Sequence, residues 1–117
     1  MDLVIDRTIW LRGEGAKASR LLRNDGKMCC VGIYLEACGV PRGELLDRST
    51  FYILPSAEKP DQASWLDEPA FSLAPSHATQ LYAANDAEMC SDREQTIAAI
   101  FAKHDVTVTF VGPEVQP

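Results

Sequence analysis

The fold is decided by residues 28–41, which read Met-Cys-Cys-Val-Gly-Ile-Tyr-Leu-Glu-Ala-Cys-Gly-Val-Pro. At about 100° per residue, one apolar stripe runs along this segment, and its members are Met28, Val31, Leu35 and Cys38. Further apolar side chains flank the stripe, so the apolar arc covers more than half of the circumference. We therefore predict a buried core helix over Met28–Cys38, ended by Gly39 and by Pro41 beyond it.

The narrow sector of this helix that is left over contains Cys29, Gly32 and Glu36. On this pattern Cys30 packs in the core, whereas Cys29 is predicted to have a route to solvent or to a cleft. A cysteine in the first turn of a helix lies near unpaired backbone N–H groups and the positive end of the dipole, which lower the thiol pKa. The sequence therefore makes Cys29 a weak candidate for a catalytic nucleophile.

A cysteine enzyme also needs a histidine as its base. The chain has two histidines, His77 and His104, and the spacing of neither one constrains it to reach Cys29. His77 is predicted to be exposed in the first turn of a helix, and His104 to interact with the dipole at the end of another helix. The alternative for Cys29 and Cys30, two small apolar residues that fill a tight helix start, is favoured.

Two more helices are predicted in the last third of the chain. Ser76 is a suitable N-cap for a helix that continues to about Ala84. Ser91 and Glu94 have the spacing of a capping box, which begins a helix that continues to about Lys103.

The N-terminal third contains shorter elements. Asp6 can cap a short helix over residues 7–12. Residues 19–28 are predicted to form a hairpin around Asn24-Asp25-Gly26, because Asp-Gly suits a type I′ turn. A helix over residues 16–23 is the alternative.

One strand is predicted near the C-terminus, because Val106, Val108 and Phe110 alternate with polar residues over 106–111. A strand requires a partner, and the candidates are residues 51–54, 20–28 and 3–5. Residues 41–75 hold five of the seven prolines and are predicted to be a long irregular connection with a short helix near 43–48. The predicted fold is α+β: a single helix-rich domain, residues 1–117, with a small antiparallel sheet that includes residues 106–111.

The charge of the chain is uneven. It has 11 Lys and Arg against 17 Asp and Glu, a net charge of −6. Residues 1–50 contain 8 basic and 7 acidic side chains, whereas residues 51–117 contain 3 and 10. This acidity argues against general nucleic-acid binding, and no apolar run is long enough to span a membrane. Four cysteines without a secretory signal indicate a cytoplasmic protein, and no cofactor or metal is predicted.

Four carboxylates lie within nine residues, and they are Asp86, Glu88, Asp92 and Glu94. Their spacing is not that of a calcium loop. They are interpreted as a solvated acidic corner or, as the functional alternative, as an acidic patch that binds a protein partner.

Several short segments together resemble a group of small uncharacterised bacteriophage and prophage proteins. These segments are Trp10-Leu11-Arg12-Gly13, Leu21-Leu22, Gly26-Lys27-Met28-Cys29-Cys30-Val31-Gly32, and Leu81 with Asn85-Asp86. The group shares a Gly-basic-x-Cys-Cys-Leu-Gly segment, in which Val31 replaces the usual Leu here, and a distal Leu-x-x-x-Asn-Asp. The resemblance implies a phage-like setting and fold-defining roles for these positions, and it supplies no catalytic residues.

Together these patterns favour a small acidic protein that acts without catalysis by binding a macromolecular partner. One concrete form is a virus-encoded inhibitor of a host defence nuclease, because an acidic patch can compete for a basic groove that holds nucleic acid. The alternatives are a thiol-dependent enzyme that uses Cys29 and a structural virion or accessory component. The oligomeric state is left open.

Overall fold

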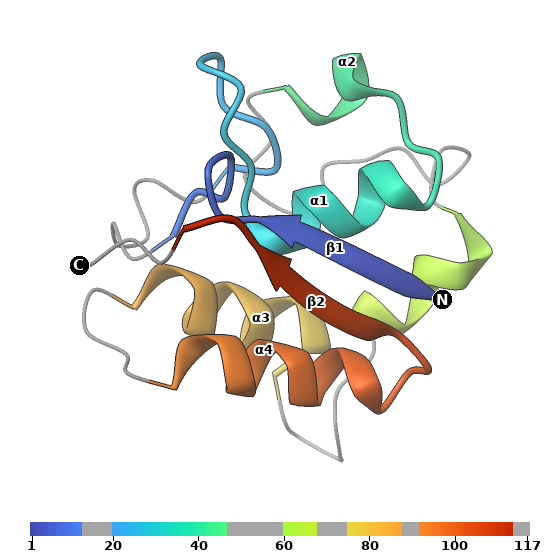
Figure 1. Cartoon of the computed structure of the whole chain (residues 1–117). Coiled ribbons are helices and arrows are strands. Elements are labelled where there is room, and N and C mark those ends of the chain that lie inside the picture. The colour runs from blue at the N-terminus through green and yellow to red at the C-terminus, as the bar shows by residue number, and fades with distance from the viewer. Residues whose placement is uncertain (13–19, 47–59, 68–74, 88–91, 114–117) are drawn as a thin grey trace.

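The computed structural model describes residues 1–12, 20–46, 60–67, 75–87 and 92–113. Figure 1 shows two adjacent strands, β1 (Asp2–Asp6) and β2 (Thr107–Val111), lying across a group of helices. The helices are α1 (Cys30–Ala37), α2 (Arg42–Leu45), the 3-10 helix η4 (Asp61–Asp67), α3 (His77–Asp86) and α4 (Arg93–Ala102). Helix α4 packs against both α3 and β2. The predicted α+β class is confirmed.

The two strands are parallel, with Leu3 opposite Val108 in the register. The predicted antiparallel sheet is therefore wrong, although residues 3–5 were one of the three predicted partners. Antiparallel neighbours are typically joined by a tight hairpin, whereas parallel strands need a long crossover. Here the helical part of the chain separates β1 from β2 and provides that crossover. The inner side chains of the sheet face the helices, since Leu3 and Ile5 are buried.

Helix α1 ends as predicted and begins two residues later than predicted. The Gly39 N–H bonds to the Glu36 carbonyl at 2.9 Å and the Val40 N–H to the Leu35 carbonyl at 3.0 Å, a Schellman motif that depends on the positive φ of Gly39, 103°. At the other end, Met28 forms a bridge with Trp10. This backbone pairing keeps Met28 extended, and the helix begins only after it.

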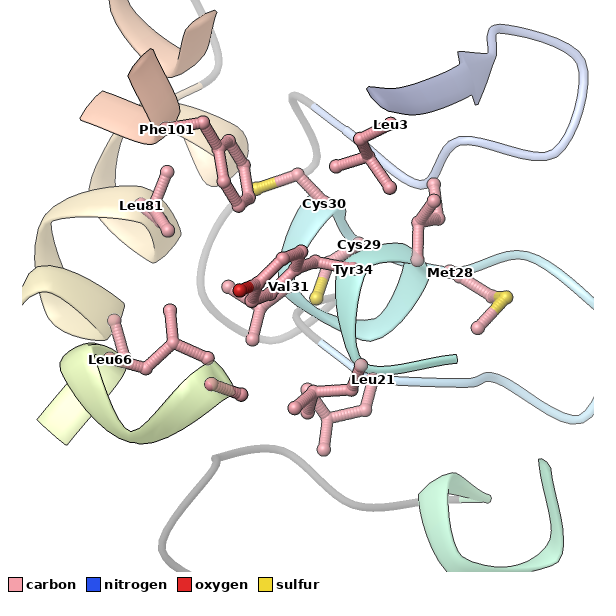
Figure 2. Close-up of a cluster of buried hydrophobic side chains, with 14 of the residues drawn as sticks. Leu3, Leu21, Met28, Cys29, Cys30, Val31, Tyr34, Leu66, Leu81 and Phe101 are labelled. Carbon is pink, nitrogen blue, oxygen red and sulfur yellow. The ribbon is translucent and has the colours of Figure 1, made fainter. Parts of the chain in front are cut away.

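The core surrounds α1, and residues 30–35 of this helix are all buried. Figure 2 shows Leu3, Leu81 and Phe101 approaching α1 from β1, α3 and α4 respectively. Tyr34 packs against Phe101 with ring centroids 5.1 Å apart. The interpretation of residues 28–38 as the central buried helix is confirmed.

The predicted helix over residues 7–12 is wrong. The Asp6 carboxylate accepts hydrogen bonds from the Thr8 N–H at 2.9 Å and the Thr8 hydroxyl at 2.7 Å, so it stabilises a turn rather than a helix N-terminus. The chain then becomes extended, and the Leu11 N–H bonds to the Met28 carbonyl at 2.8 Å.

The predicted hairpin turn is present, but its type differs. The Arg23 N–H bonds to the Lys27 carbonyl and the Gly26 N–H to the Arg23 carbonyl, which closes a three-residue loop. Of these loop residues only Gly26 has a positive φ, 91°. A type I′ turn needs two such residues, so the loop is a turn followed by a left-handed glycine. The alternative helix over 16–23 is not formed at residues 20–23, and its first four residues lie outside the described residues.

Both late helices are confirmed. Ser76 caps α3 by accepting from the Thr79 N–H at 3.2 Å, and α3 continues two residues beyond the predicted end. Helix α4 covers most of its predicted range. The Ser91 half of the capping box and the possible strand at 51–54 lie outside the described residues. Within residues 41–75, α2 agrees with the short helix predicted near 43–48, whereas η4 is a further helical turn that was not predicted.

Candidate functional site

The two adjacent cysteines lie in the core. Cys29 and Cys30 are fully buried, so the predicted route from Cys29 to solvent is wrong. The reason lies at Gly32, which has no side chain and therefore suggested, from the sequence, an open flank of the helix beside Cys29. The Leu21 backbone occupies that flank so closely that a Cβ built on Gly32 would lie 1.8 Å from the Leu21 carbonyl oxygen.

Cys29 acts as the N-cap of α1, where its sulfur accepts from the Gly32 N–H at 3.5 Å. That bond lowers the pKa of the thiol, but burial dominates and raises the pKa of Cys29 to about 12. The predicted low pKa is therefore contradicted, because desolvation outweighs the helix start.

We expect Cys29 and Cys30 to resist alkylation by iodoacetamide in the folded protein at pH 8. Their thiols are buried and their pKa values raised, whereas half-buried Cys38 should be the first of these three to react. Peptide mass spectrometry after native and denatured labelling checks this. Labelling of native Cys29 at a pH below the ordinary thiol pKa of about 8.5 would contradict it.

The two histidines form an aromatic cluster with Trp65 of η4. His104 is stacked on Trp65 with centroids 4.0 Å apart, and His77 meets the edge of His104 at 4.5 Å. The His77 Nδ1 lies 3.2 Å from the Trp65 carbonyl oxygen, and His77 is buried, so its predicted exposure is wrong. These contacts join the two imidazoles to Trp65 and to each other, in a cluster that does not include Cys29.

The segments that carry the phage-protein resemblance meet at the buried side chain of Asn85. Its amide oxygen accepts from the Trp10 Nε1 at 2.7 Å and from the Cys30 N–H at 3.0 Å. Its Nδ2 donates to the Leu11 carbonyl at 2.8 Å and to the Asp86 carboxylate at 3.1 Å. One amide thus joins its own helix to two distant segments, residues 10–11 and residue 30. The interpretation of the Cys-Cys and Asn-Asp positions as fold-defining agrees with these contacts.

Of the predicted acidic residues, Glu94 is paired with an arginine. Both carboxylate oxygens of Glu94 accept from Arg7 at 2.8 Å, and this pairing lowers the pKa of Glu94. The same carboxylate also feels the positive charges of Arg12 and Arg93. Asp86 is half-buried and Asp92 exposed, and Glu88 lies outside the described residues.

The Arg7–Glu94 pair joins the two halves of the chain that differ in charge. Arg7 and Arg12 belong to the basic N-terminal half, and the fold places them beside the acidic C-terminal half. The sequence separation of 87 residues between Arg7 and Glu94 gave no local signal for this pairing. The corner is therefore of mixed charge.

The outward face of the sheet is bare. Val4 of β1 is 56% exposed and Val111 of β2 is 39% exposed. Three further residues of the two strands are also exposed, and they are Asp2, Thr107 and Thr109. Parallel sheets are normally covered on both faces. Figure 1 shows β1 and β2 in front of the helices, so the described helices leave this face of the sheet uncovered.

No helix in the described residues is long and apolar enough to cross a membrane. No three His, Cys, Asp or Glu side chains in the same ranges are grouped so that they could hold a metal ion.

Comparisons with known proteins add no family: no family model matches the sequence, and neither the curated proteins nor the solved structures gave a match.

Proposed function

We propose that this protein acts without catalysis, by binding an extended, basic segment of a partner protein along β1. The observation that supports this is the bare parallel sheet, whose outer face exposes Val4 and Val111. A parallel sheet with one uncovered face and a free edge is a template for a further strand.

The hydrogen bonds of the sheet indicate which backbone groups are available. The Met1 carbonyl accepts from the Thr107 N–H and the Arg7 N–H donates to the Val111 carbonyl. In a parallel strand, the backbone N–H and C=O groups of every second residue point to the same neighbouring strand. The backbone groups of the odd-numbered residues of β1 therefore point to β2. The N–H and C=O of Val4 therefore point to the opposite edge, and the described sheet has no third strand there.

The charge of the strands favours a basic occupant. Neither strand contains Lys or Arg, whereas β1 has Asp2 and Asp6 on either side of Val4. The two hydrogen bonds from Thr8 lower the pKa of Asp6, which keeps this carboxylate ionised at neutral pH. A strand that alternates basic and apolar residues would match this pattern. A second copy of this acidic chain would place like charges together.

The partner class that this chemistry suggests is a nuclease, because a groove that holds nucleic acid is basic. From this chemistry and the phage-like resemblance, we propose that the protein acts in the cytoplasm as an inhibitor of a host defence nuclease. The site on the inhibitor is then β1 rather than residues 86–94, since Glu94 is already paired with Arg7.

We expect Val4→Lys to abolish partner binding without loss of stability. Val4 is exposed, so the free energy of unfolding should change by no more than about 0.5 kcal/mol, while the added charge repels a basic strand. The matched control is Leu46→Lys, since Leu46 is 45% exposed and lies outside the sheet.

The experiment uses the tagged full chain to capture partners from host cells, followed by nuclease assays and thermal unfolding of each variant. The proposal expects a captured nuclease that is inhibited by the wild-type protein and by Leu46→Lys, and not by Val4→Lys. Equal binding by both variants would contradict β1 as the binding site. Self-association through β1 would contradict a basic partner strand, and a captured partner without nuclease activity would contradict the proposed partner class.

A further inference from the structure

Near one end of the sheet, two arginines and two aromatic rings form a stacked array. The Arg7 guanidinium lies over the Phe110 ring, 5.9 Å from its centroid. Phe110 packs on Trp10 with centroids 5.1 Å apart, and the Arg12 guanidinium lies 4.4 Å from the centroid of Trp10. Stacking on an aromatic face holds a guanidinium planar and leaves its N–H donors at the edge for a ligand.

The arginines in this array differ in their partners. Arg7 donates to Glu94 and to the Gly112 carbonyl. Arg12 has no hydrogen-bond acceptor among the described residues, and its Nη1 is buried. A partly buried cationic donor without an acceptor is unfavourable, and such groups in native proteins commonly indicate an absent water or ion. Arg12 as a whole is partly exposed, so a ligand from solvent can reach the guanidinium.

Arg12 lies among charges of both signs. Arg12 feels the positive charges of Arg93 and Arg7 and the negative charge of Glu94, and Glu94 is already held by Arg7. Arg93 is fixed as well, because its Nε donates to the Ala84 carbonyl at 3.1 Å and its Nη2 donates to the Ala87 carbonyl. These four groups leave an excess of two positive charges.

We propose that Arg12, supported by Arg7 and Arg93, binds the phosphate group of a small phosphorylated ligand. A phosphate dianion balances the excess charge of the four groups, whereas a monocarboxylate leaves one positive charge uncompensated. The guanidinium fork also matches two phosphate oxygens. The free anion and a phosphate monoester share this chemistry. This site is independent of the binding function proposed for β1.

The test is a titration of the full chain with inorganic phosphate at constant ionic strength, followed in two-dimensional NMR spectra by the Trp10 indole N–H and the Arg12 Nε–H. We expect saturable shifts with phosphate and weaker binding of acetate. Arg12→Gln should weaken phosphate binding by about tenfold or more. The matched control Arg23→Gln should not change it, since Arg23 already pairs with Asp25. A parallel titration with a nucleoside 5′-monophosphate distinguishes the sources, because tighter binding than phosphate indicates a monoester and equal binding indicates the free anion.

Three results would overturn the proposal: the same shifts with chloride, acetate binding as tight as phosphate, or unchanged phosphate affinity in Arg12→Gln. If Arg12→Gln fails to fold, the comparison of phosphate with chloride and acetate on the wild-type protein decides the question.

Discussion

Replacement of Asn85 by alanine is expected to lower the free energy of unfolding by about 3 kcal/mol or more. The substitution leaves the Trp10 indole N–H, the Cys30 N–H and the Leu11 carbonyl buried without the partner they have in the native protein. Each unsatisfied group costs about 1–3 kcal/mol. Since a domain of this size is stable by only about 5–15 kcal/mol in total, the substitution should remove a large fraction of that stability.

Urea unfolding followed by circular dichroism measures this loss. The matched control is Asn24→Ala, because Asn24 lies in an exposed turn and its substitution should change stability by at most about 0.5 kcal/mol. Similar urea midpoints for Asn85→Ala and Asn24→Ala would show that the stability of the fold does not depend on the hydrogen bonds of Asn85.

The second large effect is expected for Gly32→Ala. Alanine is normally better than glycine inside a helix by about 1 kcal/mol, but here its Cβ would lie 1.8 Å from the Leu21 carbonyl oxygen. Backbone cannot rotate away as a flexible side chain can, so α1 or residue 21 must move within a close-packed core. We expect a net destabilisation of about 3 kcal/mol.

Gly43→Ala is the control for this substitution. Gly43 lies in α2 and a Cβ there would meet nothing within 4 Å, so the variant should be neutral or more stable. Thermal unfolding of the two variants side by side gives the comparison. If Gly32→Ala were as stable as Gly43→Ala, the close approach of Leu21 to α1 would be incorrect.

The parts of the fold that the sequence predicted are those set by local chemistry. Gly39 ends α1 and Ser76 begins α3 because each needs only a backbone conformation or a nearby N–H. The strand near the C-terminus was visible from its alternation, and its inner face is confirmed by the burial of Val106. These features depend on residues within a few positions of one another.

The parts that the sequence could not predict depend on distant contacts. The parallel direction of β1 and β2 follows from how the helices fold between them. Cys29 looked open to solvent because a helical wheel shows Gly32 as a gap and cannot show that the Leu21 backbone fills it. In the same way, Asp6 has the right chemistry for a cap, but pairing between Met28 and Trp10 requires the following segment to be extended.

The candidate site was predicted only in part. The Asn-Asp pair belongs to the segments that carry the resemblance, but nothing local indicates that Asn85 is buried and joins Trp10 to Cys30. The acidic residues were visible in the sequence, whereas the pairing of Glu94 with Arg7 from the other half of the chain was not. Arg12 was one charge among several in a basic stretch, and its unpartnered position over Trp10 appears only in three dimensions.

The most direct test of the account is amide hydrogen exchange along β1, measured for the protein alone and with the partner captured by the wild-type chain. In the free protein the Val4 amide should exchange rapidly and the Ile5 amide slowly. The reason is that the backbone N–H of Val4 points to the open edge, whereas the backbone N–H of Ile5 points to β2 in the parallel register. Partner binding should slow the exchange at Val4. A Val4 amide that is already protected in the free protein, or that stays unprotected in the complex, would contradict binding at the edge of β1.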